Sequence, residues 1–355
     1  MHVNIDCRFF KGEIPCIFHK KENLHCADCK HYERISERIL VIKLGAVGDV
    51  IRTTPLLRKL KQVYPDAEIN WLTEFPDIVP QLVDNIYGYE MKNIVYLLAN
   101  RFDIIYNLDK DKDACALAQL IPADQKKGFV LNMGRCAPVD ADAENKWLTG
   151  IFDDVSRQNS KSYVEEIFEI AGFKFSGEKY ILDRPKLKPD LPTIASPVIG
   201  LNTGCGKRWL PRLWPEDKWT KLAIRLKENG FSVLLLGGPD EDDKNRRIAR
   251  KSNAEYWGVV PLNEFIEVVN QTDLVVTAVT MALHVAIALE KKIILLNNIF
   301  NRHEFYLYGL GEIIEPPVDC LGCYKTECDK NCMETITVEE VFSKICQIID
   351  KNSTK

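Results

Sequence analysis

A single carboxylate, Asp49, lies in a glycine-containing loop after a hydrophobic strand. The stretch RILVIKLGAVGDVIRTTPLL, residues 38–57, indicates a strand, a loop and a helix. Gly45 and Gly48 permit a tight turn, and free N–H groups at the start of the following helix favour an anion. The loop lacks both the G-x-G-x-x-G spacing of dinucleotide-binding turns and the lysine and hydroxyl of a P-loop. We therefore consider two roles for Asp49: N-cap of the helix, or general base at the carboxyl edge of a parallel sheet.

A second loop combines glycines, a hydroxyl and cations. In GLNTGCGKRWLPRLWPEDKW, residues 200–219, a strand is followed by Thr203, Gly204 and Lys207. A diphosphate needs backbone N–H groups and neutralising charge, which such a loop supplies at the carboxyl end of a strand. The pattern therefore predicts a diphosphate site, and a solvated basic loop is the alternative.

Two further motifs follow later strands. In LLLGGPDEDD, residues 234–243, Glu241 lies just past a strand, where an acid commonly accepts hydrogen bonds from ribose hydroxyls. The alternative is a solvated start of a helix. In VVTAVTMALHVAIALEKK, residues 275–292, Thr280 and His284 lie around the start of an apolar helix. His284 is either a satisfied core residue or a functional group near a ligand.

Eight of the twelve cysteines lie near the two ends of the chain. The C-terminal set has the spacing C-x2-C-x4-C-x3-C and predicts a tetrahedral metal site of four thiolates: Cys320, Cys323, Cys328 and Cys332. The N-terminal set has a looser spacing, with His19, His25 and His31 nearby, and predicts a second site: Cys7, Cys16, Cys26 and Cys29. Zinc, iron and an iron–sulfur cluster all remain open as structural cofactors, and reduced thiols without metal are the alternative.

The hydrophobic pattern indicates two α/β domains. A chain of 355 residues exceeds what one hydrophobic core usually organises. Apolar runs of strand length alternate with segments of helical period, as in parallel sheets with crossover helices. The predicted segments are a start rich in cysteine and histidine, a first Rossmann-like domain, a proline-rich linker, a second Rossmann-like domain, and a four-cysteine segment with a final helix: residues 1–37, 38–187, 188–197, 198–318 and 319–355.

The same pattern predicts individual elements. Strands are expected at residues 67–73, 92–98 and 102–108, and a helix from Arg52 to Tyr64. Residues 110–163 lack a clear period and are expected to form loops and short helices. Past the linker, strands and helices alternate again. Two Rossmann-like domains facing each other would place the ligand site in the cleft between them.

Charge and hydropathy exclude several classes of protein. A net charge of -4 argues against binding nucleic acid through a basic surface. No apolar run reaches the length of a membrane span, and the start MHVNIDCRFFKGE lacks the pattern of a secretory signal. We therefore expect a cytoplasmic protein that makes at most peripheral contact with a membrane.

Taken together, four ordered motifs resemble those of glycosyltransferase family 9, the heptosyltransferases of lipopolysaccharide core assembly. The chain carries GDVIRTTPLL, KRWLPRLWPEDKW, GGPDE and VTMALH in the family's order, within residues 38–350. The cysteine-rich stretch followed by CMETITVEEV also matches many members. The resemblance implies a GT-B fold, in which the N-terminal domain takes the acceptor and the C-terminal domain takes an ADP-sugar.

The resemblance also implies roles for particular residues. Asp49 would deprotonate an acceptor hydroxyl, with inversion at the anomeric carbon, and Lys207 would contact the donor diphosphate. The remaining donor-binding residues would be Thr203 and Gly204 in the phosphate loop, Glu241 at the ribose, and Thr280 and His284 beside the donor. No catalytic metal is implied, because helix N-termini and cations stabilise the departing diphosphate. The implied partners are an ADP-sugar, ADP-heptose foremost, and a glycan, lipid-linked or protein acceptor at the inner membrane.

Three departures from the family pattern bear on these roles. The family's sugar-contacting aspartate falls at Val279 and its glycine at Met281, which removes hydrogen bonds to donor sugar hydroxyls. The lysine loop carries an insertion whose Arg208 and Arg212 either contact an anion or face water. Two other functions therefore stand beside catalysis: a degenerate member that only binds a nucleotide or glycan, and a module whose metal-bound ends assemble oligomers. The resemblance also bears on the metal: in a protein heptosyltransferase branch of the family, a cysteine site binds iron.

Overall fold

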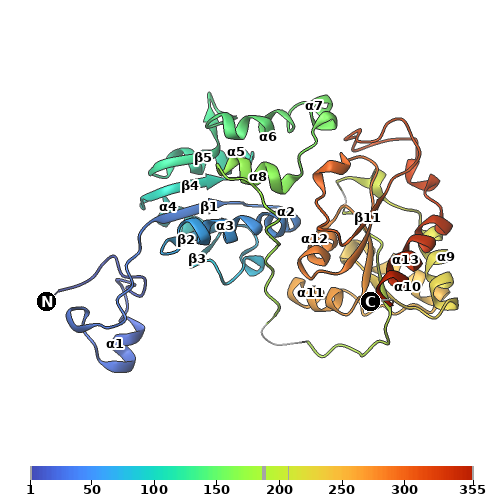
Figure 1. Ribbon diagram of the computed structural model, residues 1–355, viewed down its shortest axis with the longest axis horizontal. Coiled ribbons are helices and arrows are strands. Elements are labelled where there is room, and N and C mark those ends of the chain that lie inside the picture. Colours follow the sequence, from blue (N-terminus) through green and yellow to red (C-terminus); the bar gives the residue numbers. More distant parts are fainter. Residues whose placement is uncertain (1, 186–188, 207, 354–355) are drawn as a thin grey trace. The chain divides into compact units, whose positions relative to one another are not determined.

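The computed structural model describes residues 2–185, 189–206 and 208–353, which form two compact units (Figure 1). The first unit contains the described residues up to Leu44, together with Leu56–Pro76 and Gln81–Ala143. The second contains Gly45–Pro55, Asp77–Pro80 and the chain from Glu144 onwards. The Asp49 loop therefore belongs to the same unit as the motifs of the C-terminal half.

The first unit is built on a six-stranded sheet in the order β3-β2-β1-β4-β5-β6. Its strands are parallel except for the β5–β6 pair: β1 Arg38–Ile42, β2 Glu68–Thr73, β3 Asn85–Gly88, β4 Phe102–Asn107, β5 Ala123–Asn132 and β6 Arg135–Pro138. Its helices are α1 Ile17–Glu22, η1 Cys26–Asp28, α3 Pro55–Val63, α4 Met91–Leu98, α5 Lys112–Leu120 and η3 Ala141–Ala143. Strand β1 is almost wholly buried, as expected for a central parallel strand covered on both faces.

One predicted element of this region is wrong, and two others are only partly correct. Residues 92–98 form helix α4, not a strand, because Ile94, Leu97 and Leu98 lie three and four residues apart and pack on one core. The predicted helix from Arg52 to Tyr64 is interrupted, since α2 Val47–Thr53 ends before Pro55, where α3 begins. Residues 110–163 contain α5 and the ten-residue strand β5, whose polar residues conceal the period of a strand.

The second unit carries a five-stranded, wholly parallel sheet in the order β11-β10-β9-β7-β8. Its strands are β7 Val198–Asn202, β8 Ser232–Leu236, β9 Leu274–Ala278, β10 Lys292–Leu296 and β11 Gly311–Ile314. Its helices are α2, η2 Pro76–Ile78, α6 Glu144–Leu148, α7 Asp153–Gln158, α8 Tyr163–Ile170, η4 Leu210–Arg212, α9 Glu216–Glu228, η5 Pro239–Glu241, α10 Asp242–Ser252, α11 Leu262–Asn270, α12 Met281–Ala288, η6 Arg302–Glu304, η7 Cys332–Thr335 and α13 Val338–Ser353. The predicted α/β fold with two mainly parallel sheets is confirmed.

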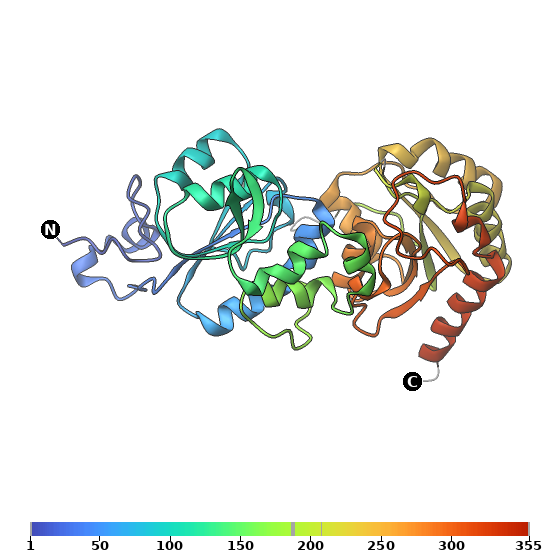
Figure 2. The same ribbon diagram turned by 90° about the horizontal axis from the view of Figure 1, so that it is seen from above.

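The last helix, α13, packs beside α9 (Figure 2). Val341 and Ile345 on α13 share one hydrophobic core with Trp219 and Leu222 on α9. The predicted amphipathic helix at the end of the chain is therefore part of the second unit's core. Among the helices of the described residues, none is both long and apolar enough to cross a membrane.

Candidate functional site

Asp49 occupies the third position of helix α2, not the N-cap, which is Ala46. Its Oδ2 atom accepts a hydrogen bond from the Ala46 N–H at 3.4 Å, so the carboxylate satisfies a free amide of the first turn. The Asp49 side chain is 35% exposed. The carboxylate therefore caps the helix from within and remains accessible to a hydroxyl.

Arg52, which the sequence patterns did not select, is the ionic partner of Asp49. Its Nη2 atom lies 2.7 Å from Asp49 Oδ1, one helical turn away, and its Nε is buried without a hydrogen bond to any described residue. The guanidinium carbon lies 3.4 Å from the centre of the Tyr163 ring, a cation–π contact. Burial has the largest single effect on the pKa of Arg52 and lowers it, but the Asp49 carboxylate, together with smaller contributions from Tyr163, Glu304 and Tyr180, leaves this pKa raised. The i, i+3 spacing from Asp49 is the signal that could have identified Arg52.

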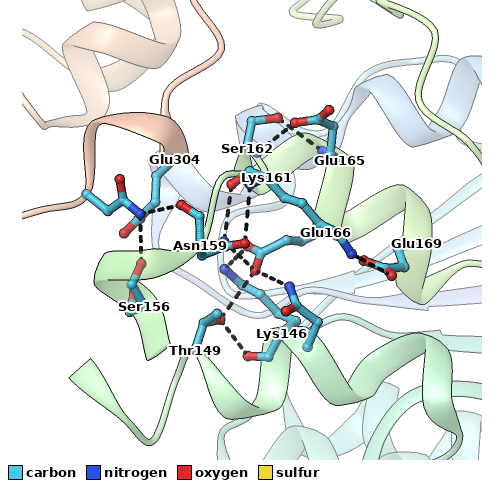
Figure 3. Close-up of polar contacts among 12 residues, drawn as sticks. Lys146, Thr149, Ser156, Asn159, Lys161, Ser162, Glu165, Glu166, Glu169 and Glu304 are labelled. Atoms are coloured by element: carbon cyan, nitrogen blue, oxygen red, sulfur yellow. Dashed lines mark hydrogen bonds and ion pairs between the residues drawn. The ribbon is translucent and has the colours of Figure 1, made fainter. Parts of the chain in front are cut away.

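A buried polar network is centred on Glu166 (Figure 3) and reaches Tyr163 through Lys146. Glu166, which is 1% exposed, lies 2.5 Å from Lys146 Nζ, and the ammonium in turn lies 4.7 Å from the Tyr163 ring centre. Thr149 and Asn159 also donate to Glu166 Oε1, at 3.3 and 3.1 Å. The Tyr163 ring thus contacts two cations, Arg52 and Lys146, and the second is fixed by a buried carboxylate.

His284, on α12, packs directly against the Asp49 loop. A Cβ atom built on Gly48 would lie 2.7 Å from His284 Cδ2, so the ring occupies the space that glycine leaves empty. His284 Nδ1 lies 3.5 Å from the Tyr180 hydroxyl. Burial and the nearby Arg52 lower the pKa of His284 to about 3, although Asp49 opposes the shift. His284 is therefore a neutral imidazole at the pH of the cell, and both the core and the functional interpretations remain open.

The buried His284 makes folding sensitive to acid. Its pKa is about 3 in the folded chain, whereas an unperturbed histidine has a pKa of about 6.5, so the unfolded chain binds more protons between these values. We expect the free energy of unfolding to fall by up to about 1.4 kcal/mol per pH unit as pH decreases through this window. Urea denaturation at several pH values would measure it, with His284→Gln as the control that loses this contribution. An equal acid sensitivity in that variant would contradict the assignment.

A methyl group at position 48 tests the contact between the loop and α12. We expect Gly48→Ala to lower the free energy of unfolding by about 1–3 kcal/mol, because the buried His284 ring must move to admit the new Cβ. Gly134→Ala is a useful comparison, since an added Cβ there meets no atom within 4 Å, although its positive φ brings its own strain. Thermal denaturation measures both variants, and pairing Gly48→Ala with His284→Ala should restore stability if the clash is the cause.

Three of the predicted donor residues, Thr203, Gly204 and Glu241, lie where β7 and β8 end. The Thr203 hydroxyl donates to Asn245 Oδ1 at 2.6 Å, and Glu241 Oε2 accepts from the Gly238 N–H at 3.0 Å. A Cβ on Gly204 would lie 2.2 Å from the Glu241 carboxyl group, so the carboxylate rests on the bare backbone of the predicted phosphate loop. Lys207 lies outside the described residues. The structure therefore brings the loop and the predicted ribose acid together.

Lys244 adds a cation to this loop that the sequence patterns did not select. Its Nζ atom donates to the Thr203 carbonyl at 2.8 Å. Burial lowers the pKa of Lys244, while the Glu241 carboxylate partly restores it. Lys244 directly follows the acidic run of residues 240–243, which could also have been a solvated helix start. It lies three residues after Glu241, on the first turn of α10. That spacing was the available signal, because residues three apart lie on one helix face.

Arg212 lies in the insertion of the loop after β7 and holds that insertion by hydrogen bonds to backbone carbonyls. It neither faces water nor contacts an acid among the residues described. Its buried guanidinium donates to the carbonyls of Cys205 at 2.5 Å, Trp209 at 3.3 Å and Val279. The alternative that Arg212 faces water is therefore wrong, whereas Arg208 is exposed. Contact of either arginine with a ligand anion stays a prediction. Arg212 connects the loops that follow the neighbouring strands β7 and β9.

Thr280 is the N-cap residue of α12, and its hydroxyl takes part in hydrogen bonds at the edge of the sheet. Asn202 Nδ2 donates to Thr280 Oγ1 at 3.1 Å, and the Thr277 hydroxyl lies at the same distance. Thr280 is thus partly buried in a network that joins β7 to β9. Its contact with a donor remains a prediction.

The cysteine sets do not converge on a metal ion. Among the described residues, no group of three or more His, Cys, Asp or Glu side chains is placed to hold one. In the C-terminal set, Cys320 is exposed on a loop, and the Cys332 sulfur accepts from Asn298 Nδ2 at 3.2 Å. The predicted single-ion sites at Cys320, Cys323, Cys328 and Cys332, and at Cys7, Cys16, Cys26 and Cys29, therefore do not fit the thiol positions of this structure. The thiols of both sets are free of disulfides.

A family model and a curated relative both place this chain among heptosyltransferase-type proteins. Residues 92–308 match the model of glycosyltransferase family 9 (heptosyltransferase). Lipopolysaccharide heptosyltransferase 3 of Escherichia coli K12 is 26% identical over 233 residues, covering 55% of this chain and 62% of the relative. The chain thus spans less than two thirds of the length of that curated relative.

Solved structures share the fold. A family 9 glycosyl transferase from Veillonella parvula superposes with a TM-score of 0.67 at 16% identity, covering 90% of this chain and 99% of that one. TibC, an iron-containing dodecameric enzyme of enterotoxigenic E. coli, superposes in its complex with ADP-D-beta-D-heptose with a TM-score of 0.57 at 12% identity, covering 89% and 76%. These likenesses show the GT-B fold. The family model matches more than half of this chain, and the chain therefore belongs to glycosyltransferase family 9.

Proposed function

We propose that this chain is an inverting glycosyltransferase that moves a sugar, heptose foremost, from an ADP-linked donor to a glycan. The acceptor is a lipopolysaccharide core or another cell-surface glycan, reached at the cytoplasmic face of the inner membrane. Family membership supports the reaction class. The observation that carries the mechanism is the Asp49 carboxylate, held by the Ala46 amide and Arg52 yet 35% exposed.

In the proposed reaction Asp49 removes the proton of the acceptor hydroxyl. The hydroxyl oxygen then forms a bond to the anomeric carbon, on the face opposite the bond to the departing diphosphate, so the configuration inverts. ADP leaves with the electron pair of the broken bond. Lys244 offsets its negative charge together with the backbone amide of Gly204, since the Thr203 amide already donates to the Leu236 carbonyl, and the motif assigns Lys207 the same role as Lys244. Glu241 accepts hydrogen bonds from the ribose.

A transfer assay tests this proposal. The full chain is incubated with ADP-heptose and a lipopolysaccharide-type acceptor, and the glycoside is identified by mass spectrometry and NMR. We expect the anomeric configuration of the product to be opposite to that of the donor. Retention of configuration would contradict the single displacement, and use of only a UDP- or GDP-sugar would contradict the donor assignment.

A second candidate function is nucleotide or glycan binding without catalysis. It is favoured by Val279, whose apolar side chain replaces an aspartate of the family pattern and whose carbonyl already accepts from Arg212. Such a side chain offers no hydrogen bond to a sugar hydroxyl. Calorimetry with ADP and with ADP-heptose, followed by product analysis, separates the two functions. An enzyme binds both and consumes the second, whereas a binding protein leaves ADP-heptose intact.

A further inference from the structure

The N-terminal segment encloses a cavity of about 190 Å³ that all four of its cysteines line. Cys7 lies where the chain bridges to Arg34, Cys16 precedes helix α1, and Cys26 and Cys29 lie at the two ends of one 3-10 turn. The turn is closed by the Cys29 N–H, which bonds the Cys26 carbonyl at 3.4 Å. Four sulfurs from three parts of the segment therefore face one volume.

The thiols surround this volume instead of meeting at one point. Within the described part of the chain no trio of metal-ligating side chains is placed around a single ion, although every one of these cysteines is free and half-buried. The cavity is also many times larger than the roughly 10–15 Å³ that a water needs by the same kind of measure. The size of the cavity and the spread of the four cysteines along its wall favour a polynuclear occupant over a single ion.

Much of the rest of the wall is apolar. Phe9, Phe10 and Phe18 line the cavity together with Ile14 and Leu24. Apolar side chains around a site lower its local polarity.

Two of the four histidines that line the cavity have hydrogen-bond partners within the segment. His19 Nδ1 lies 3.0 Å from the Leu24 carbonyl, and His31 Nε2 lies 2.8 Å from Glu22 Oε1. The His31 ring also stacks on Phe18 with their centres 3.8 Å apart. These contacts hold His19 and His31 in the wall, which His2 and His25 also line.

We propose that the N-terminal segment binds an iron–sulfur cluster through Cys7, Cys16, Cys26 and Cys29. Four cysteine thiolates are the usual ligands of such clusters, whose inorganic sulfide spaces the irons apart and so spreads the thiolates around a cavity. The cluster is distinct from the transferase residues, because no residue of the cavity wall belongs to the candidate active site. Its role is to hold together a segment of 36 described residues whose helices have no buried side chain.

Acid-labile sulfide is the decisive measurement, because neither zinc nor mononuclear iron contains it. The full chain is purified without oxygen and reconstituted with ferrous iron and sulfide, and iron, sulfide and zinc are counted per chain. We expect iron and sulfide in about equal amounts and a broad visible absorption from sulfur-to-iron charge transfer. A chain that takes up one zinc ion and no sulfide overturns the proposal.

Two matched variants locate the cluster. Cys26→Ser/Cys29→Ser should lose the sulfide, whereas Cys320→Ser/Cys323→Ser, which alters the same C-x2-C spacing near the other end, should keep it. The reverse pattern overturns the assignment. If the first variant fails to fold, thiol alkylation of the wild-type chain decides. The four N-terminal cysteines should resist modification until the cluster is removed, and free reaction of any of them in the loaded chain overturns the proposal.

Discussion

Replacing Asp49 by asparagine is expected to lower kcat by about 10²–10⁴-fold, the usual contribution of a general base. Asparagine retains an oxygen that can accept the Ala46 N–H, so the first turn of α2 keeps its capping contact. The variant loses the charge that takes the proton and pairs with Arg52. Initial rates of transfer, with ADP-heptose affinity measured separately by calorimetry, check the expectation.

Glu165→Gln is the matched control for Asp49→Asn. Glu165 occupies the same third position in α8, and its Oε2 accepts from the Ser162 N–H at 2.7 Å. If Asp49 only caps its helix, the two variants should affect turnover alike. Full transfer activity in Asp49→Asn would refute its role as base, and an equal effect of the two variants on turnover would leave only the capping role.

Replacing Glu166 by glutamine is expected to lower the free energy of unfolding by roughly 3–5 kcal/mol. The two side chains have almost the same shape, so packing is kept, and Thr149 can still donate to the remaining oxygen. The change removes the buried charge that faces Lys146, whose side chain is only 16% exposed. The ammonium would then stay in a poorly solvated place without that carboxylate. Urea denaturation followed by circular dichroism measures the loss.

Glu169, three residues after Glu166 on the same helix, provides the matched control for Glu166→Gln (Figure 3). Glu169 pairs with Lys161 at 2.6 Å, but both side chains are more than one third exposed. We expect Glu169→Gln to cost at most about 1 kcal/mol, since solvent and salt weaken such pairs. Similar losses in the two variants would show that burial does not set the strength of the Glu166 pair. A double variant, Lys146→Met/Glu166→Leu, should recover part of the stability.

The sequence predicted the sheets well where strands were apolar and well delimited. Runs such as those of β1 and β7 have few alternatives, because buried parallel strands need continuous hydrophobic residues. Strand β5 was missed because half of it is polar, and α4 was misread because its isoleucine and valine also suit strands. In both cases tertiary packing decided between local preferences of similar strength.

The candidate site was predictable only in part, for a related reason. Motif order selected Asp49, Glu241 and His284, and the structure places His284 against the Asp49 loop. Arg52 and Lys244 were not predicted, because a cation in a helix is usually solvated. Only their burial distinguishes these two residues from ordinary surface cations. The polar network behind Tyr163 joins α6 and α8, so no local pattern records it.

Arg212 has a consequence for ligand affinity. Its guanidinium donates to the carbonyls of Cys205 and Val279, so these two points of the loops after β7 and β9 are held together in the free chain. A ligand that binds there pays less of the entropic cost of ordering these two points. The insertion that lengthens the loop after β7 thus also supplies the side chain that ties it to the loop after β9. Removing the guanidinium would transfer that cost from folding to binding.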